Sequence, residues 1–515
     1  MDAQAQVDRI EPKRLFAFMA MCFGMFMAFL DIQIVSSSLS DIQAGLAASS
    51  DEIPWVQTAY LIAEVVAIPL SGFLSRALGT RMLFSVSAAG FTLASLACGL
   101  SSSMDSMIVW RAVQGFIGGG MVPTVFAAIY TMFPKSRQPS IVPIVGLIAT
   151  LAPTVGPTIG GYLTDHFSWH WLFFINIVPG IAVTVATAML IDFDKPDYSL
   201  LDHFDWSGLI AMAGFLGALE YVLEEGPRYD WFEDETVLYA AILSGLSAIA
   251  FFYRALTART PIVDLRAFAN RNFALGSMFS FVLGIGLYGL TYLYPVYLAQ
   301  VRGYNSLMIG DTMFVSGLAM FFSAPFVGRL SAKYDPRIML IGGFLMFALG
   351  TYQMHYLTKD WDFWELFWPQ VFRGIGLMAA MVPVTNVALG TLPPERIKNA
   401  SGLFNLMRNL GGAIGLASLT TLLNDRMDLH LQRLHDSANW SRGPANDMLA
   451  TLTARFHDFG ANAPVMAIKE MSLMARQQAA VMSFADVFLL MTVLFVALAV
   501  LGIVMKRPAA VGGGH

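Results

Sequence analysis

Residues 151–161 read LAPTVGPTIGG, a run of small and apolar residues interrupted by two prolines. A proline removes one backbone donor and ends most helices in water, whereas helices in a membrane tolerate it. Glycines four residues apart lie on one face of a helix and let a second helix approach closely. The stretch therefore predicts a bent, closely packed membrane helix, although such glycines also occur in ordinary helix packing. The residues that carry the pattern are Pro153, Gly156, Pro157, Gly160 and Gly161.

The rest of the chain has the composition of a membrane protein. Of its 515 residues, 56% are hydrophobic and 13% are charged, whereas soluble domains carry about 25% charged residues. A membrane-spanning helix needs about 20 apolar residues. Runs of that length predict an all-α integral membrane protein with fourteen transmembrane helices. Their centres lie near Phe26, Glu64, Phe91, Ile117, Ala149, Val178, Phe215, Leu243, Gly286, Met320, Met346, Ala379, Gly411 and Val493.

The positive charges predict how these helices are oriented. Most of the 31 Lys and Arg residues fall in the tails and loops on the same side of the membrane as the N-terminus. The short loops on the other side contain only Arg228, Arg302 and Lys359. Because positive residues collect on the cytoplasmic side of a membrane, we expect both termini in the cytoplasm. The segment 425–480 then lies outside, either as a cap over the outer mouth or as a docking element for a partner.

Composition and motifs argue against several other functions. The net charge of −5 provides no basic surface for nucleic acid. Cys22 and Cys98 lie within apolar runs, which favours packing over a disulfide or a metal site. The eight histidines are scattered, and neither a Ser/His/Asp grouping nor a GxxxxGK phosphate-binding sequence is present. We therefore expect a transporter rather than an enzyme, with no metal, no ATP and no other cofactor, driven by an ion gradient or by the substrate's own gradient.

Two parts of the sequence repeat each other at a shift of about 260 residues. Three short motifs occur in the same order in both parts, which is hard to obtain by chance. Two parallel six-helix bundles with two helices inserted between them (6+2+6) describe the major facilitator architecture. We predict an N-terminal bundle over 1–191, two linker helices within 192–270 and a C-terminal bundle over 271–515. The motif pairs are Pro69-x-x-Gly72 with Pro325-x-x-Gly328, Arg111-x-x-Gln114-Gly115 with Gln370-x-x-Arg373-Gly374, and Pro134-x-x-Arg137 with Pro393-x-x-Arg396.

With these motifs the chain resembles the fourteen-helix drug:proton antiporters of the Major Facilitator Superfamily, of the EmrB/QacA type. Residues 151–161 are similar to the antiporter motif, and residues 111–115 to the RxxQG motif, whose arginine the family links to proton transfer. The resemblance implies proton-driven efflux of hydrophobic or amphipathic small molecules by alternating access across the bacterial inner membrane. It also implies a tripartite pump with an EmrA-type periplasmic adaptor and a TolC-type outer-membrane channel.

Other functions remain open at this point. The nearest alternative is a stand-alone proton-coupled exporter of one metabolite, such as a siderophore, a fatty acid or an amino acid derivative. An importing symporter agrees less well with the antiporter-like motif. A membrane-embedded lipid-processing enzyme agrees less well with the lack of a soluble catalytic domain.

One loop departs from the pattern of the superfamily. It reads GFLSRALGTR over 72–81, and Arg76 stands where the pattern has an aspartate. The usual cytoplasmic acid–base latch is therefore altered. The conformational gating residues that we predict are Gly72, Gly79, Arg81, Gln114 and Gly115.

Charged residues inside the bilayer are candidates for coupling, because a charge at the membrane centre costs roughly 3 kcal/mol or more. Asp31 lies past the middle of the first helix, where a nearby Arg111 would alter its affinity for a proton. We predict proton coupling by Asp31 and Arg111; a fixed structural ion pair between them is the alternative. Glu64 is a further candidate, which would share the proton, attract cationic substrates or only pack against hydroxyl groups.

Tyrosines around 288–297 suggest a substrate pocket. An apolar cavity with a few hydroxyl groups suits promiscuous binding, although aromatic residues in membrane helices often face lipid instead. The predicted pocket residues are Tyr288, Tyr292, Glu220 and Asn386.

Overall fold

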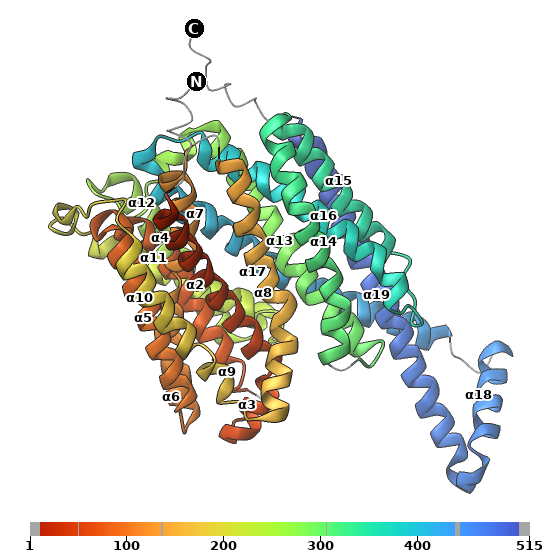
Figure 1. The fold of residues 1–515 in the computed structure, drawn as a ribbon. Coiled ribbons are helices and arrows are strands. Elements are labelled where there is room, and N and C mark those ends of the chain that lie inside the picture. Colours follow the sequence, from red (N-terminus) through yellow and green to blue (C-terminus); the bar gives the residue numbers. More distant parts are fainter. Residues whose placement is uncertain (1–10, 50, 135–136, 305, 438–442, 504–515) are drawn as a thin grey trace.

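The structure is a computed structural model that describes residues 11–49, 51–134, 137–304, 306–437 and 443–503. Within these ranges every regular element is a helix, and the prediction of an all-α protein is confirmed. The helices form one elongated bundle from which a helical hairpin projects (Figure 1). The side chain of Pro153, and the basic residues Arg9, Lys135, Lys506 and Arg507 that entered the orientation argument, lie outside what the structure describes.

The N-terminal part contains nine helices within its described residues. Two of the predicted spans are divided into shorter pieces, at 119–120 and at 175–176, where the chain bends. The helices are α2 (Pro12–Ser37), α3 (Leu39–Leu46), α4 (Trp55–Ala77), α5 (Gly79–Gly99), α6 (Met104–Gly118), α7 (Met121–Met132), α8 (Gln138–His166), α9 (Trp171–Phe174) and α10 (Ile177–Leu190).

Two further helices follow, α11 (Trp206–Glu225) and α12 (Glu235–Thr257), with short 3-10 turns η1 (Tyr198–Leu201) and η2 (Trp231–Glu233) beside them. Asp205 caps α11 by accepting from the backbone of Gly208, and it pairs with Arg254 of α12 at 2.7 Å. Helix α11 also packs against α4, so that the inserted helices contact the N-terminal part directly.

The C-terminal part continues with η3 (Leu265–Ala269), α13 (Arg271–Gln300), α14 (Ser306–Lys333), α15 (Pro336–Met354), α16 (Phe363–Gly390), α17 (Pro394–Ser437), α18 (Gly443–Arg455), η4 (His457–Asn462) and α19 (Ala463–Gly502). The segment 425–480 is largely helical: α17 and α19 run on beyond the bundle, and α18 packs beside α19 (Figure 1).

Twelve helices of the described chain are long and apolar enough to cross a membrane. This agrees with a multi-pass membrane protein. Helices α8 and α17, with 29 and 44 residues, occupy the positions of the two remaining predicted spans but are not among these twelve. The count of fourteen and the three domain boundaries therefore stay predictions.

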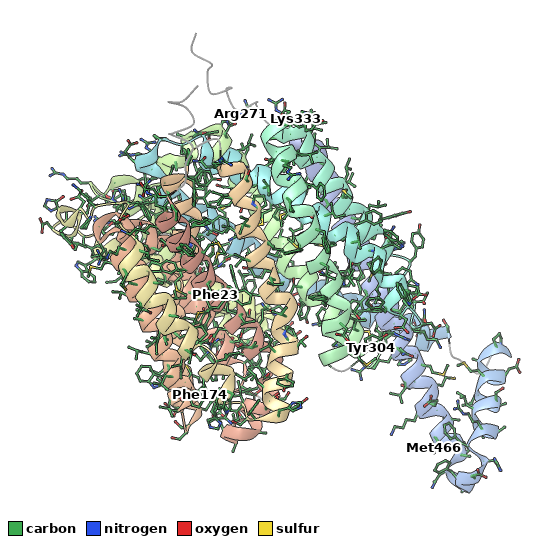
Figure 2. The ribbon with its side chains drawn as sticks, viewed as in Figure 1. Phe23, Phe174, Arg271, Tyr304, Lys333 and Met466 are labelled. Carbon is green, nitrogen blue, oxygen red and sulfur yellow. The ribbon has the colours of Figure 1, made fainter. Side chains whose placement is uncertain are left out.

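The two ends of the bundle differ. We call the end where α2 begins the Pro12 end, and the opposite one the Ser37 end. Figure 2 shows Arg271 and Lys333 at the Pro12 end, with Phe174 and Met466 toward the Ser37 end. The projecting hairpin of α18 and the start of α19 lies beyond the Ser37 end (Figure 1).

Candidate functional site

Several helices of the N-terminal part converge on the carboxylate of Asp31. This side chain lies on α2 and is 0% exposed. Its Oδ2 accepts a hydrogen bond from Nη1 of Arg111 at 2.6 Å, and its Oδ1 accepts from Gln114 at 3.1 Å and from Asn176 at 2.8 Å. Asn176 in turn donates to Ser95 of α5 at 3.1 Å. We call these five residues the Asp31 cluster; its donors stabilise the charged carboxylate in a site without bulk water.

Arg111 is held from a second side by α4. Its Nε donates to the carbonyl of Val56 at 3.0 Å, and its guanidinium lies 4.3 Å from the centre of the Tyr60 ring. Its Nη2 and the hydroxyl of Tyr60 have no hydrogen-bond partner within the described chain. A buried arginine is stable only when its charge is compensated, and here one carboxylate, one carbonyl and one ring do so. Arg111 thus links α6 to α2 and to α4.

The residues of the RxxQG motif contact the same neighbours, Asp31 and Tyr60. Gln114 accepts from Arg111 at 2.8 Å and donates to Asp31. A Cβ added at Gly115 would lie 2.2 Å from the carbonyl oxygen of Tyr60, so only glycine allows α6 to approach α4 this closely. The predicted gating residues Gln114 and Gly115 are therefore found next to the predicted coupling residues Asp31 and Arg111.

The antiporter-like stretch of α8 lies against α2 just beyond Asp31. A Cβ on Gly156 would lie 2.4 Å from the Cβ of Gln33, and one on Gly160 would lie 2.9 Å from the carbonyl oxygen of Ile34. Pro157 and Gly161 are half-buried on the same helix. The glycines of α8 thus permit the close approach that their spacing predicts, and the helix that α8 approaches, α2, carries the predicted coupling residue Asp31.

Glu64 of α4 is 5% exposed, and it forms no hydrogen bond or ion pair with the residues that the structure describes. It interacts electrostatically with Arg111 and Asp31. The three predicted coupling residues therefore share one buried region, in which Glu64 is the carboxylate without a bonded partner.

A second group of predicted residues meets around Tyr288 of α13. Its hydroxyl donates to Asn409 of α17 at 3.2 Å, and it interacts electrostatically with Arg408, Glu64 and Glu220. Glu220 is 7% exposed although it lies on the inserted helix α11. Helix α11 thus contributes a carboxylate to the buried region between the two parts.

Arg408 of α17 also belongs to this group, and it is not among the site residues that the sequence predicts. It is 5% exposed, and its guanidinium lies 4.9 Å from the ring centre of Phe126 in the other part of the molecule. It donates to Asn405 and forms no ion pair within the described residues. A cavity of ≈ 10 Å³ beside it, room for about one water, is lined mainly by apolar side chains together with Ser280 and Thr385.

One predicted pocket residue, Asn386, lies elsewhere. Asn386 accepts from Tyr130 at 3.3 Å and donates to Ser331 at 3.5 Å, close to the Pro12 end. Tyr292 is half-buried. Of the neighbouring tyrosines, Tyr297 is fully buried in the C-terminal part, and its hydroxyl donates to the carbonyl of Thr358 at 2.6 Å.

The C-terminal repeat reproduces the arginine–glutamine pair without the acid. Arg373 donates to Gln370 at 3.1 Å and to Thr291 at 3.3 Å, and its guanidinium lies 5.1 Å from the ring centre of Tyr294. No ion pair to a carboxylate is present at Arg373 within the described chain. The buried acid bonded to an arginine therefore occurs in the N-terminal copy of the motif and not in this one.

The remaining predicted gating residues lie at the Pro12 end. A Cβ on Gly72 would lie 2.9 Å from the Cα of Asn399 and from the carbonyl oxygen of Lys398, both on α17. Gly79 has a φ of 78°, which side chains rarely adopt, at the turn between α4 and α5. Arg81 is exposed, near the start of α5.

Comparisons with known proteins agree with this arrangement. The profile of the Major Facilitator Superfamily matches residues 21–416. The chain is 43% identical to the "Colistin resistance protein EmrB" of Acinetobacter baumannii, over 95% of this chain and 96% of that protein. It is 29% identical to the "Multidrug export protein EmrB" of Escherichia coli strain K12, over 96% of each chain. It is also 29% identical to the "Fatty acid resistance protein FarB" of Neisseria gonorrhoeae, over 95% of this chain and 96% of that protein.

Among solved structures, the human organic anion transporter MFSD10 (TETRAN) has a TM-score of 0.59 at 13% identity, with 94% of this chain and 100% of that chain covered. The proton:xylose symporter XylE has a TM-score of 0.57 at 11% identity, with 94% and 95% covered. The protein is thus a multi-pass membrane transporter, and the chain belongs to the Major Facilitator Superfamily. Within that superfamily it is EmrB-like, related to multidrug export and resistance proteins, as the motifs predict.

Proposed function

We propose that this protein exports hydrophobic or amphipathic small molecules across the bacterial inner membrane and that protons moving inward drive the export. The relatives named for multidrug export support the efflux, and the close packing of α8 on α2 beside a buried acid supports the coupling. Alternating access between the two membrane faces needs no ATP and no other cofactor.

The proposal includes fourteen membrane-spanning helices in a 6+2+6 arrangement. Helices α8 and α17 join the twelve apolar helices as spans; Arg396, Lys398 and Arg408 make α17 less apolar. The domains then run over 1–191, 192–270 and 271–515. Both termini lie in the cytoplasm, so that the Pro12 end is the cytoplasmic end and the hairpin of α18 lies outside.

The observation that carries the proposed coupling is the buried carboxylate of Asp31 with its three donors. Protonation of Asp31 removes the charge that Arg111 and Gln114 bind. The contacts that tie α6 and α10 to α2 then weaken together, and the balance between two conformations shifts. Glu64 interacts electrostatically with both Arg111 and Asp31, and it is the second site that we propose for the proton.

The substrate region that we propose contains charges of both signs. Glu64 and Glu220 supply negative charge around Tyr288, Arg408 supplies positive charge, and Phe126 provides an aromatic surface beside the guanidinium. Buried charges without an ion partner favour a ligand that brings a complementary group. Amphipathic molecules of either charge therefore suit this region. Tyr292 remains a proposed pocket residue, whereas the contacts of Asn386 suit a role at the cytoplasmic end.

The projecting hairpin supports a partner outside the membrane, for which we propose an EmrA-type adaptor in a pump with a TolC-type channel. An open depression of ≈ 850 Å³ lies along its helices, and its lining includes Leu449, Thr453 and Pro464. The second candidate function is a stand-alone exporter of one metabolite. The relative named for fatty acid resistance favours it, because Arg408 would suit a carboxylate.

The coupling is tested in inside-out vesicles that hold an acid-inside proton gradient, read with a pH-sensitive dye. Hydrophobic compounds that discharge the gradient with the wild type should fail to do so with Asp31→Asn, because the variant carries no exchangeable proton at this site. Asp311→Asn, which alters an exposed carboxylate on α14, serves as the matched control. Undiminished discharge by Asp31→Asn would make the Asp31–Arg111 contact a fixed structural pair.

A further inference from the structure

We propose that Asp194 and Lys398 form a latch that closes the cytoplasmic end of the transporter. Asp194 supplies the acid that the loop over 72–81 lacks. Both are positioning residues, which set how often the two parts separate at this end. The inference rests on the alternating access of the proposed function, but not on proton coupling or on the identity of the substrate.

The acid is fixed to the N-terminal part by the segment that follows α10. Oδ2 of Asp194 accepts from the backbone N–H of Thr80 at 2.9 Å and from its hydroxyl at 2.6 Å, at the start of α5. Three residues further on, the backbone N–H of Asp197 donates to the carbonyl of Arg76 at 3.2 Å. The segment thus lies over the turn between α4 and α5, and it presents Asp194 whether or not α17 is near.

The cation comes from the other part of the molecule. Lys398 lies near the start of α17, and its Nζ donates to Asp194 and, at 2.9 Å, to the carbonyl of Ser75. The exposed fractions of the two side chains are 13% for Lys398 and 14% for Asp194. Salt screens such a shielded ion pair only weakly. Removing either partner leaves the other charge uncompensated at the junction.

The latch lies beside other close contacts between the two parts at this end. Gly72 allows α4 to contact the backbone of α17 at Asn399. One turn further, Ser401 donates to the carbonyl of Pro123 on α7 at 2.6 Å. A Cβ on Gly402 would lie 3.2 Å from the carbonyl oxygen of Ile68. These contacts close the cytoplasmic side between α4, α7 and α17, and they must separate before a substrate enters from that side.

The side chain of Arg76 does not replace the acid at the junction with α17. Its side chain lies 5.8 Å from the ring centre of Phe73 and interacts with Asp197 and Asp264. Asp197 lies in the segment that follows α10, and Asp264 lies directly before η3, so neither partner is on α17. Arg76 thus helps to hold the segment that carries Asp194. The junction therefore contains an acid, although the loop over 72–81 does not supply it.

The test measures how often this end opens. Cys22 and Cys98 are both fully buried, so a single added thiol can be followed. Ser401 is 0% exposed at the closed junction, and Ser401→Cys is the reference protein. The rate at which a water-soluble maleimide labels position 401 is measured on purified protein in nanodiscs, and complete labelling after denaturation gives the total thiol.

In that background, Asp194→Asn and Lys398→Met should each raise the labelling rate about tenfold, because each removes one charge of the pair. The double variant should label no faster than the faster single one, since both changes break the same contact. Lys398→Arg, which retains the charge, should stay near the reference rate. Asp192→Asn is the matched control: this acid lies in the same segment but pairs with Lys13 at the exposed surface.

Unchanged labelling in both single variants, or a double variant whose rate is the product of the single effects, would overturn the latch. This outcome is independent of the vesicle experiment on Asp31. A protein that exchanges no protons can still show a latch, and a proton-coupled exporter can lack one.

Discussion

At the scale of single residues, the central buried region contains charges that differ in their partners. Asp31 is bonded to three donors, whereas Glu64, Glu220 and Arg408 are more than nine-tenths buried without a bonded ion partner in the described chain. Well-bonded charges fix geometry, and unbonded ones are available to a ligand or a proton. The two kinds of residue therefore make different predictions.

Changing the unbonded charges should alter which compounds are exported. Glu220→Gln should lower the export of an amphipathic cation such as tetraphenylphosphonium by about tenfold, while Arg408→Gln should lower the export of dodecanoate to a similar extent. Each variant should leave the other compound nearly unaffected. The measurement is efflux from cells at equal expression, with Arg373→Gln as a control for removing a buried guanidinium. Equal losses for both compounds would rule out the charge selectivity.

The glycine of the RxxQG motif allows a test of packing at a single residue. Gly115→Ala should lower the free energy of unfolding by about 2 kcal/mol, because the added methyl group meets the Tyr60 carbonyl. Gly245→Ala on α12 is the matched control, since nothing lies within 4 Å of its Cβ. Thermal unfolding in detergent compares them. A similar melting temperature for both variants would show that α6 and α4 separate at no cost.

At the scale of elements, loop residues fix where helices begin. Asp362 caps α16, and Glu365 completes a capping box. Tyr304 donates to the carboxylate of Asp362, and this hydrogen bond, with that from the backbone of Phe363 and the charge of Arg302, lowers the pKa of Asp362. Because the pKa is lowered in the folded state, the stabilisation is present above the ordinary pKa of an aspartate and is lost as the pH falls through the folded value.

Asp362→Asn should therefore destabilise the protein at neutral pH but much less in acid. Asparagine is itself a good N-cap, so the substitution mainly removes the charge. Melting temperatures of the wild type and the variant should differ at pH 7 and converge toward pH 3. A difference that stays constant across this range would assign the effect to the cap and not to the charge.

The extensions of α17 and α19 are elements with a proposed partner. His430 and Arg426 of α17 both approach Asp486 of α19, at 2.9 and 3.6 Å, which joins the two helices where they leave the bundle. A photo-crosslinker at Leu449 in the hairpin hollow should capture an EmrA-type adaptor in intact cells. The same group at Trp364, which is 74% exposed on α16, should not. Capture at neither position would favour the stand-alone exporter.

At the scale of the whole molecule, sequence patterns predict what is local and repeated. The spans, the Asp31–Arg111 contact and the close packing at Gly156 follow from apolar length, from the cost of a buried charge and from glycine spacing. The roles of Asn176 and Lys398 do not follow, because their partners Asp31 and Asp194 lie 145 and 204 residues away. A single sequence carries no local signal for such pairs. The place of Arg408 does not follow either, because the groups that surround it depend on the assembled fold.

The described chain has no carboxylate bonded to Arg373, and this distinguishes the charge of the C-terminal copy of the motif from that of the N-terminal copy. A guanidinium keeps its proton at any pH that a cell experiences, so the C-terminal copy of the motif carries a positive charge with no bonded carboxylate in the described chain, whereas the N-terminal copy pairs the same charge with Asp31. The two copies of the motif therefore differ in net charge. Under the proposed coupling, a proton that reaches Asp31 changes the charge of the N-terminal copy alone, and Arg373 keeps its charge throughout the transport cycle.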